Sequence, residues 1–187
     1  MASSYSTDLK LELMVTGENS GTWGDKTNTN LNLLQQAIAG YQEVSIAGGA
    51  QTTALAMTDA TISNARNAVI KFTGTITGNQ IVTIPDSIEK TYTIINGTSG
   101  AFTVQFKTVS GTGFTFAAAD KGTRLAYADG TNVVDVNAAF TTISQFTLPA
   151  ADGTSGQAIV TNGSGTLSFA QAGISTGKAI AMAIVFG

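Results

Sequence analysis

The feature that most constrains the fold is a succession of short apolar segments between residues 43 and 137, separated by Gly, Asn, Asp and Pro. The segments are rich in Thr, Val, Ile and Phe, which favour half-buried, pleated surfaces. Strands are predicted at residues 44–46, 54–57, 68–75, 80–84, 91–95, 102–107, 114–116, 124–127 and 133–136. Asp129-Gly130 predicts a hairpin between the last two. This spacing predicts an antiparallel β-sandwich or jelly-roll-like domain, whose connectivity the pattern leaves open.

The first forty residues have a different pattern. Leu9, Leu11, Leu13 and Val15 alternate with Lys10, Glu12 and Met14, which predicts a strand with the leucines facing inward. Residues 17–24 have the Gly, Asn and Ser content of a loop and include the single tryptophan, Trp23.

A helical stripe follows this loop. Leu31, Leu34 and Ile38 are spaced as on one face of a helix, so we predict a short helix over residues 28–39, with Gly40 at the C′ position. Because a helix of this length is marginal alone, the stripe is expected to pack on the protein's own sheet, on symmetry-related copies or on a partner.

The C-terminal part predicts one more hairpin and an apolar tail. Residues 157–161 and 166–169 flank the turn Asn162-Gly163-Ser164-Gly165. Such a hairpin is barely stable by itself. The tail, residues 178–187, is expected to be buried in an oligomer because its apolar side chains would otherwise promote aggregation: Ile180, Met182, Ile184 and Phe186. The predicted organisation is therefore residues 1–42, 43–139 and 140–187.

Composition excludes several chemistries. The chain has no Cys and no His, which excludes disulfides, thiolate nucleophiles, a Ser-His-Asp triad and the usual zinc sites. Its 9 basic residues are scattered and the net charge is -3, so nucleic-acid binding is not expected. There is no signal-like N-terminus and no apolar run long enough to span a bilayer, so neither export by a standard signal nor membrane insertion is expected. We expect no cofactor and no metal.

Only 11% of the residues are charged, fewer than a lone domain normally needs for solubility. We therefore expect other chains to cover much of the surface.

Two further kinds of site were weighed against structural roles. Asp86 with Glu89, or Asp129 with Asp135, could form a glycosidase pair, but Asp86 and Asp129 stand at turns. The aromatic side chains that could stack sugars have the spacing of core positions: Phe102, Phe106, Phe114, Phe116 and Tyr127. No enzyme activity is expected.

Three stretches resemble tail-fibre and related virion proteins of tailed bacteriophages, especially those of marine and cyanobacterial hosts. Residues 5–14, with 16–24 and 28–31, are similar to the segment that opens many such fibres. Residues 127–134 and the strands before them resemble a recurrent β domain of these fibres. Residues 148–169 resemble a repeated fibre element of the form DGTxGQ…GxGxLSF.

The resemblance implies a non-enzymatic virion component, often a homotrimer, attached to the tail through its N-terminal part. This chain lacks a long repetitive shaft, so it is expected to be a short tail fibre or an adaptor. Its expected partners are other tail proteins and, for host attachment, a host-surface glycan or receptor. The residues expected to dock on the tail are Trp23, Leu9, Leu11, Leu13, Leu31, Leu34 and Ile38. The alternatives are a capsid decoration protein and a carbohydrate-binding or carbohydrate-cleaving tail tip.

Overall fold

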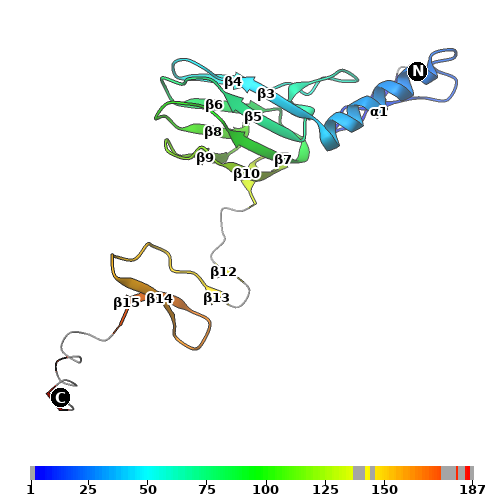
Figure 1. The fold of residues 1–187 in the computed structure, drawn as a ribbon. Coiled ribbons are helices and arrows are strands. Elements are labelled where there is room, and N and C mark those ends of the chain that lie inside the picture. Colours follow the sequence, from blue (N-terminus) through cyan, green and yellow to red (C-terminus); the bar gives the residue numbers. More distant parts are fainter. Residues whose placement is uncertain (1–2, 137–141, 144–145, 174–179, 181–183, 186–187) are drawn as a thin grey trace. The chain divides into compact units, whose positions relative to one another are not determined.

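The structure is a computed structural model that describes residues 3–136, 142–143, 146–173, 180 and 184–185. The chain forms two units, residues 1–138 and 139–187, and each is described by itself (Figure 1). Strands make up 41% and helix 14% of the chain, which confirms the prediction of a mainly β protein with an N-terminal helix. The sequence boundary at residue 139/140 lies beside the boundary between the units, whereas residues 1–42 belong to the same unit as the strands that follow.

Unit 1 is built on two facing sheets. One has the strand order β11-β10-β7-β5-β3 and the other the order β4-β6-β8-β9. The strands are β3 (Tyr41–Ser45), β4 (Gln51–Ala54), β5 (Val69–Thr73), β6 (Gln80–Ile84), β7 (Glu89–Asn96), β8 (Val104–Thr108), β9 (Gly113–Phe116), β10 (Thr123–Asp129) and β11 (Val133–Asp135). Each of them overlaps one of the predicted segments, so the short apolar segments and the turn residues between them located every strand of this domain.

The pairing of these strands is mixed. The chain passes from β3 to β4, from β5 to β6 and from β7 to β8, each time crossing from one sheet to the other. The three passes stack as coils, so β3, β5 and β7 are parallel, as are β4, β6 and β8. Antiparallel pairing, expected throughout, occurs for β8 with β9 and for β10 with β7 and β11. Short buried strands have the same apolar pattern in either direction, so the pattern could not distinguish them.

Glycines form the corners at which each coil leaves the first sheet. Gly48, Gly74 and Gly100 follow β3, β5 and β7 and have φ angles of 106°, 103° and 103°. A Cβ atom on Gly100 would lie 2.2 Å from the carbonyl oxygen of Ile76 in the coil below. The corner therefore requires glycine both for its backbone conformation and for the close approach of the coils.

The core lies between the two sheets. Phe106 packs against Phe72 and Tyr92, with ring centroids 6.0 and 5.8 Å apart. Phe106 and Phe116 are fully buried, while Phe102 and Phe114 pack partly buried against this core, as predicted for them. Tyr127 differs, because its side chain is 40% exposed on β10. The coils thus behave as a sandwich whose two inner faces interdigitate.

Unit 2 contains the predicted C-terminal hairpin, β14 (Gln157–Thr161) paired antiparallel with β15 (Leu167–Gln171), and two short paired strands, β12 (Thr142–Ile143) and β13 (Phe146–Thr147). A Cβ atom on Gly153 would lie 2.6 Å from the ring of Phe169, so that ring closes over the loop before β14. The Asn162 side chain accepts from the backbone N–H of Ser164 and Thr166 and fixes the turn. Several residues of the fibre-like element thus have local structural roles.

Candidate docking surface at the N-terminal helix

The helix α1 (Trp23–Ala39) begins earlier than predicted. Trp23 and Gly24, assigned to the loop from their composition, form the first helical residues, with Thr22 at the N-cap position and Asp25 in the first turn. Acidic residues favour the N-terminal turn because they complement the helix dipole. The loop prediction for Trp23 is therefore wrong, and its side chain belongs to the surface of the helix.

Gly40 ends the helix for a different reason from the one predicted. Its φ of -69° and ψ of 139° are extended rather than left-handed. A Cβ atom there would lie 2.2 Å from the carbonyl oxygen of Gln36 and 2.4 Å from the amide oxygen of Asn67. Glycine is needed because the end of α1 is pressed against the start of the β domain.

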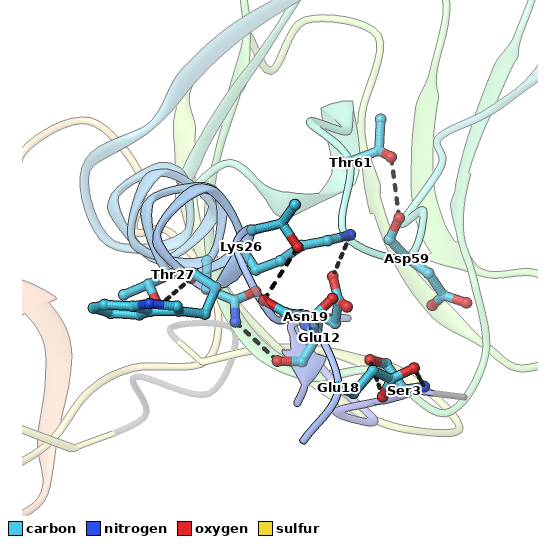
Figure 2. A network of polar contacts seen from close by, with 11 residues as sticks. Ser3, Glu12, Glu18, Asn19, Lys26, Thr27, Asp59 and Thr61 are labelled. Atoms are coloured by element: carbon cyan, nitrogen blue, oxygen red, sulfur yellow. Dashed lines mark hydrogen bonds and ion pairs between the residues drawn. The ribbon is translucent and has the colours of Figure 1, made fainter. Parts of the chain in front are cut away.

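One face of α1, the inner face, is occupied by the protein's own chain. Leu33 is the buried residue of the helix. Asn30 exchanges two hydrogen bonds with the backbone of Glu12: its oxygen accepts from the Glu12 N–H at 2.9 Å, and its amide donates to the Glu12 carbonyl at 2.8 Å. Lys26, one turn earlier, forms an ion pair with the Glu12 carboxylate at 3.0 Å (Figure 2).

These polar contacts also set the ionisation of the pair. The hydrogen bond from Lys26 lowers the pKa of the Glu12 carboxyl, with a further contribution from the Ser3 hydroxyl. The same contact raises the pKa of Lys26. Both groups are thus held in their charged forms, so the first strands, β1 (Ser4–Tyr5) and β2 (Glu12–Leu13), are fastened to the helix over a wide pH range.

The burial of the N-terminal segment differs from the one predicted from its alternating leucines. Glu12 is the buried residue of this stretch, whereas Leu13 is 50% exposed and Leu9 and Leu11 are half-buried. The expectation that Leu13 faces inward is therefore wrong. The physical reason is the Asn30 and Lys26 contacts, which draw the glutamate rather than the leucine toward the helix.

A buried arginine joins this segment to the β domain. Arg66, at the end of the 3₁₀ turn η1 (Asn64–Arg66), is fully buried. It donates to the carbonyl oxygens of Leu9 at 3.0 Å and Thr58 at 2.7 Å, to that of Thr61, and to the Gln36 side chain. Burial lowers the pKa of its guanidinium. Sequence analysis missed this residue, because a lone Arg between two loops gives no periodic signal.

The outer face of α1 is apolar and exposed. Trp23, Leu31, Leu34 and Ile38 are 66, 57, 37 and 71% exposed. They follow one another at helical spacing, with Thr27 between the first two. In unit 1, Figure 1 shows α1 extending from the β3 end of the sheets rather than lying over a sheet face. Of the alternatives left open by the sequence, packing of this stripe on the protein's own sheet is therefore not what the structure has.

The predicted oligomerisation residues are only partly described. Ile180 and Ile184 are 54 and 78% exposed. Met182 and Phe186 lie outside the described residues.

The acidic residues weighed as a glycosidase pair have structural partners. Asp86 accepts from the backbone N–H and hydroxyl of Ser110, which lower the pKa of its carboxyl. Asp129 accepts from the N–H groups of Asn132 and Thr131 in the hairpin turn, which lower its pKa as well. Asp135 pairs with Arg124. A general acid needs a raised pKa, so the shifts of Asp86 and Asp129 run in the opposite direction.

Comparisons with protein-family models, with curated proteins and with solved structures found no match for this chain. Within the described part of the chain, no helix has the length and apolar character needed to cross a membrane. The same residues contain no group of three potential His, Cys, Asp or Glu ligands for a metal ion.

Proposed function

We propose that this chain is a structural subunit of the tail of a tailed bacteriophage, a short tail fibre or an adaptor, and that it acts as a homotrimer. Its first 42 residues attach the subunit to other tail proteins, and its β domain forms the body. The proposal combines the resemblance of three stretches to phage fibre proteins with the physical character of the surface. It assigns assembly, rather than catalysis, as the mechanism.

The observation that carries the proposal is the outer face of α1. Four large apolar side chains stand in a row on a helix whose neighbouring face is held by an ion pair, two amide hydrogen bonds and Leu33. Scattered exposed apolar residues are ordinary, but a contiguous row on a rigid element indicates an interaction surface. Trp and Leu at such a surface contribute binding energy when a partner removes them from water.

The low charge of the chain supports the same conclusion. With 9 basic and 12 acidic residues in 187, and ion pairs already using Lys26, Lys71 and Arg124, little ionic surface remains to keep a lone subunit soluble. Burial between subunits would cover apolar area at about 25 cal/mol per Å². Ile180, Met182, Ile184 and Phe186 are proposed to contribute to this burial.

Localisation on particles tests the proposal. Phage produced with an epitope-tagged copy of this protein would be labelled with gold-conjugated antibody and imaged by electron microscopy. Label at the tail is the expected result. Label distributed over the capsid would favour the decoration-protein alternative and overturn the tail assignment, as would particles that carry no copy of the chain.

A matched pair of variants tests whether the outer face of α1 is used in assembly. Leu31→Asn places a polar amide in the outer face of α1, whereas Asn32→Ala alters an exposed residue beside it. We expect particles to incorporate the first variant poorly and the second normally. Equal incorporation of both variants would show that the outer face of α1 is not used in assembly.

A further inference from the structure

The spacing of the outer face of α1 has a specific geometry. Within this face, Thr27, Leu31, Leu34 and Ile38 follow one another at alternating steps of four and three residues, and Trp23 lies beside this row. This is the heptad spacing of the a and d positions of a coiled coil, with Leu31 and Ile38 at a and Leu34 at d. An apolar face that packs on a sheet is usually wider, so the narrow seam favours another helix as the partner.

We infer that this seam binds α1 of other copies of the same chain, with the helices parallel and in register. The inference rests on the proposed function, in which the chain is an oligomer, and it names another copy of α1 as the partner of the exposed stripe. The N-terminal segments of the copies would then be presented together at one end of the assembly.

Residues beside the seam favour an identical partner. The flanking e and g positions are Asn28, Asn30, Gln35 and Ala37, all uncharged. The charged residues of α1 are Asp25 and Lys26, and Lys26 is already paired with Glu12. Identical helices can therefore approach without repulsion between like charges. A charged partner would find no complementary charge along this seam.

The relative direction of the associating helices follows from the apolar side-chain layers that a parallel and an antiparallel arrangement would each form. With parallel helices in register, Leu31, Leu34 and Ile38 each meet their own counterparts, which gives three apolar layers. Antiparallel helices centred on Leu31 and Leu34 would place Ile38 against Thr27 and lose an apolar layer. Shifting the centre toward Ile38 places Leu31 beyond Ala39, where the partner helix has ended. The parallel arrangement therefore buries the most apolar surface.

The existing contacts of α1 leave room for this association. On a helical projection of 100° per residue, Leu33, Lys26 and Asn30 lie on the side held by the N-terminal strands. The seam lies on the neighbouring side, where its three apolar residues, Leu31, Leu34 and Ile38, are exposed. Self-association therefore requires no rearrangement of unit 1.

Sedimentation of the purified full-length chain tests the inference. The wild-type protein should sediment as an oligomer, and Leu34→Asn or Ile38→Asn should shift toward the monomer mass over a dilution series in which the wild type stays oligomeric, with an unchanged circular dichroism spectrum. Asn32→Ala is the matched control and should keep the oligomer. A monomeric wild-type protein, or Asn variants that keep the wild-type mass, would overturn the inference.

Cross-linking tests the register, and the absence of natural cysteine makes its result unambiguous. Under oxidation, Leu34→Cys should form a disulfide-linked dimer, because parallel helices place the two copies of residue 34 face to face. Asn32→Cys, on the polar side, should remain largely unlinked. Equal cross-linking of both variants would overturn the arrangement. These measurements use no phage particle, so oligomers with a normal seam but without tail label would contradict only the proposed location.

Discussion

The Arg66 guanidinium donates a hydrogen bond to the carbonyl oxygen of Leu9, a residue 57 positions earlier, at 3.0 Å. Its other donors reach the carbonyl oxygens of Thr58 and Thr61 and the Gln36 side chain on α1. One buried side chain thus holds together the N-terminal segment, the helix and the loop between β4 and β5. The orientation of the outer face of α1 depends on this arrangement.

Arg66→Ala should destabilise unit 1 strongly. Removal of the guanidinium takes a hydrogen bond from each of three carbonyl groups and opens a cavity, so we expect a loss of about 3 kcal/mol in the free energy of unfolding. Urea unfolding followed by circular dichroism measures this loss. Lys121→Ala, which removes hydrogen bonds near the protein surface, is the control and should cost about 1 kcal/mol or less. Similar losses for the two variants would contradict the role assigned to Arg66.

The sequence allowed the strands to be located but not the way they pair. Alternation of Ile70 and Phe72, or of Val104 and Phe106, shows which side chains face the core, and this depends only on local backbone geometry. Parallel stacking of the coils depends on pairing between distant segments, such as Val69 of β5 with Thr93 of β7. No local sequence pattern contains this information.

Glycine corners test that stacking. In Gly100→Ala the alanine must adopt a left-handed φ of 103°, and its Cβ atom clashes with the Ile76 carbonyl oxygen. The substitution should therefore lower the free energy of unfolding by more than about 2 kcal/mol. Gly48→Ala is the matched control, since its φ is 106° but a Cβ atom there would meet nothing within 4 Å. It should cost about 1 kcal/mol. Thermal unfolding of the two variants gives the comparison, and equal losses would show that the coils are not in close contact at Gly100.

The stability of unit 1 should depend on the ionisation of Lys90. Its ammonium group donates to the carbonyl oxygens of Asn67 and Thr91 and lies 4.3 Å from the ring centroid of Tyr92. Burial lowers the pKa of Lys90 to about 8. Between this value and the ordinary 10.5 the unfolded chain binds more protons than the folded one, so stability increases as pH rises. We expect a gain of about 2 kcal/mol between pH 8 and 10 in urea unfolding.

Two further measurements identify the source of this gain. Lys90→Met should flatten the pH dependence, whereas Lys107→Met on β8 of the facing sheet should leave it in place. Above pH 10 the trend should reverse, because burial raises the pKa of Tyr92 and the unfolded chain then loses the tyrosine proton first. An unchanged slope in Lys90→Met would refute the assignment to Lys90.

The candidate docking surface was predictable in part. The spacing of Leu31, Leu34 and Ile38 identified the stripe, but whether it would be buried by the protein's own sheet could not be known from spacing alone. That outcome is decided by Asn30, Lys26 and Leu33, which turn the other side of the helix toward the chain. Trp23 joined the stripe because the helix begins at Trp23, where glycine-rich neighbours had favoured a loop.

Removal of residues 178–187 tests the remaining oligomerisation prediction. If Ile180, Ile184 and their neighbours bury apolar area between subunits, the oligomer of the truncated chain should be weaker than that of the full chain. It should dissociate at a higher protein concentration and melt at a lower temperature. Sedimentation and thermal unfolding over a range of protein concentrations measure both effects.

Leu34→Asn introduced into the truncated chain separates the contribution of the α1 seam from that of the C-terminal tail. If the tail and the seam both join subunits, the combined variant should be monomeric, while truncation alone should weaken the oligomer and leave the Leu34→Cys cross-link intact. A truncated chain with unchanged mass and melting temperature would assign self-association to the α1 seam and remove the C-terminal residues from the interface.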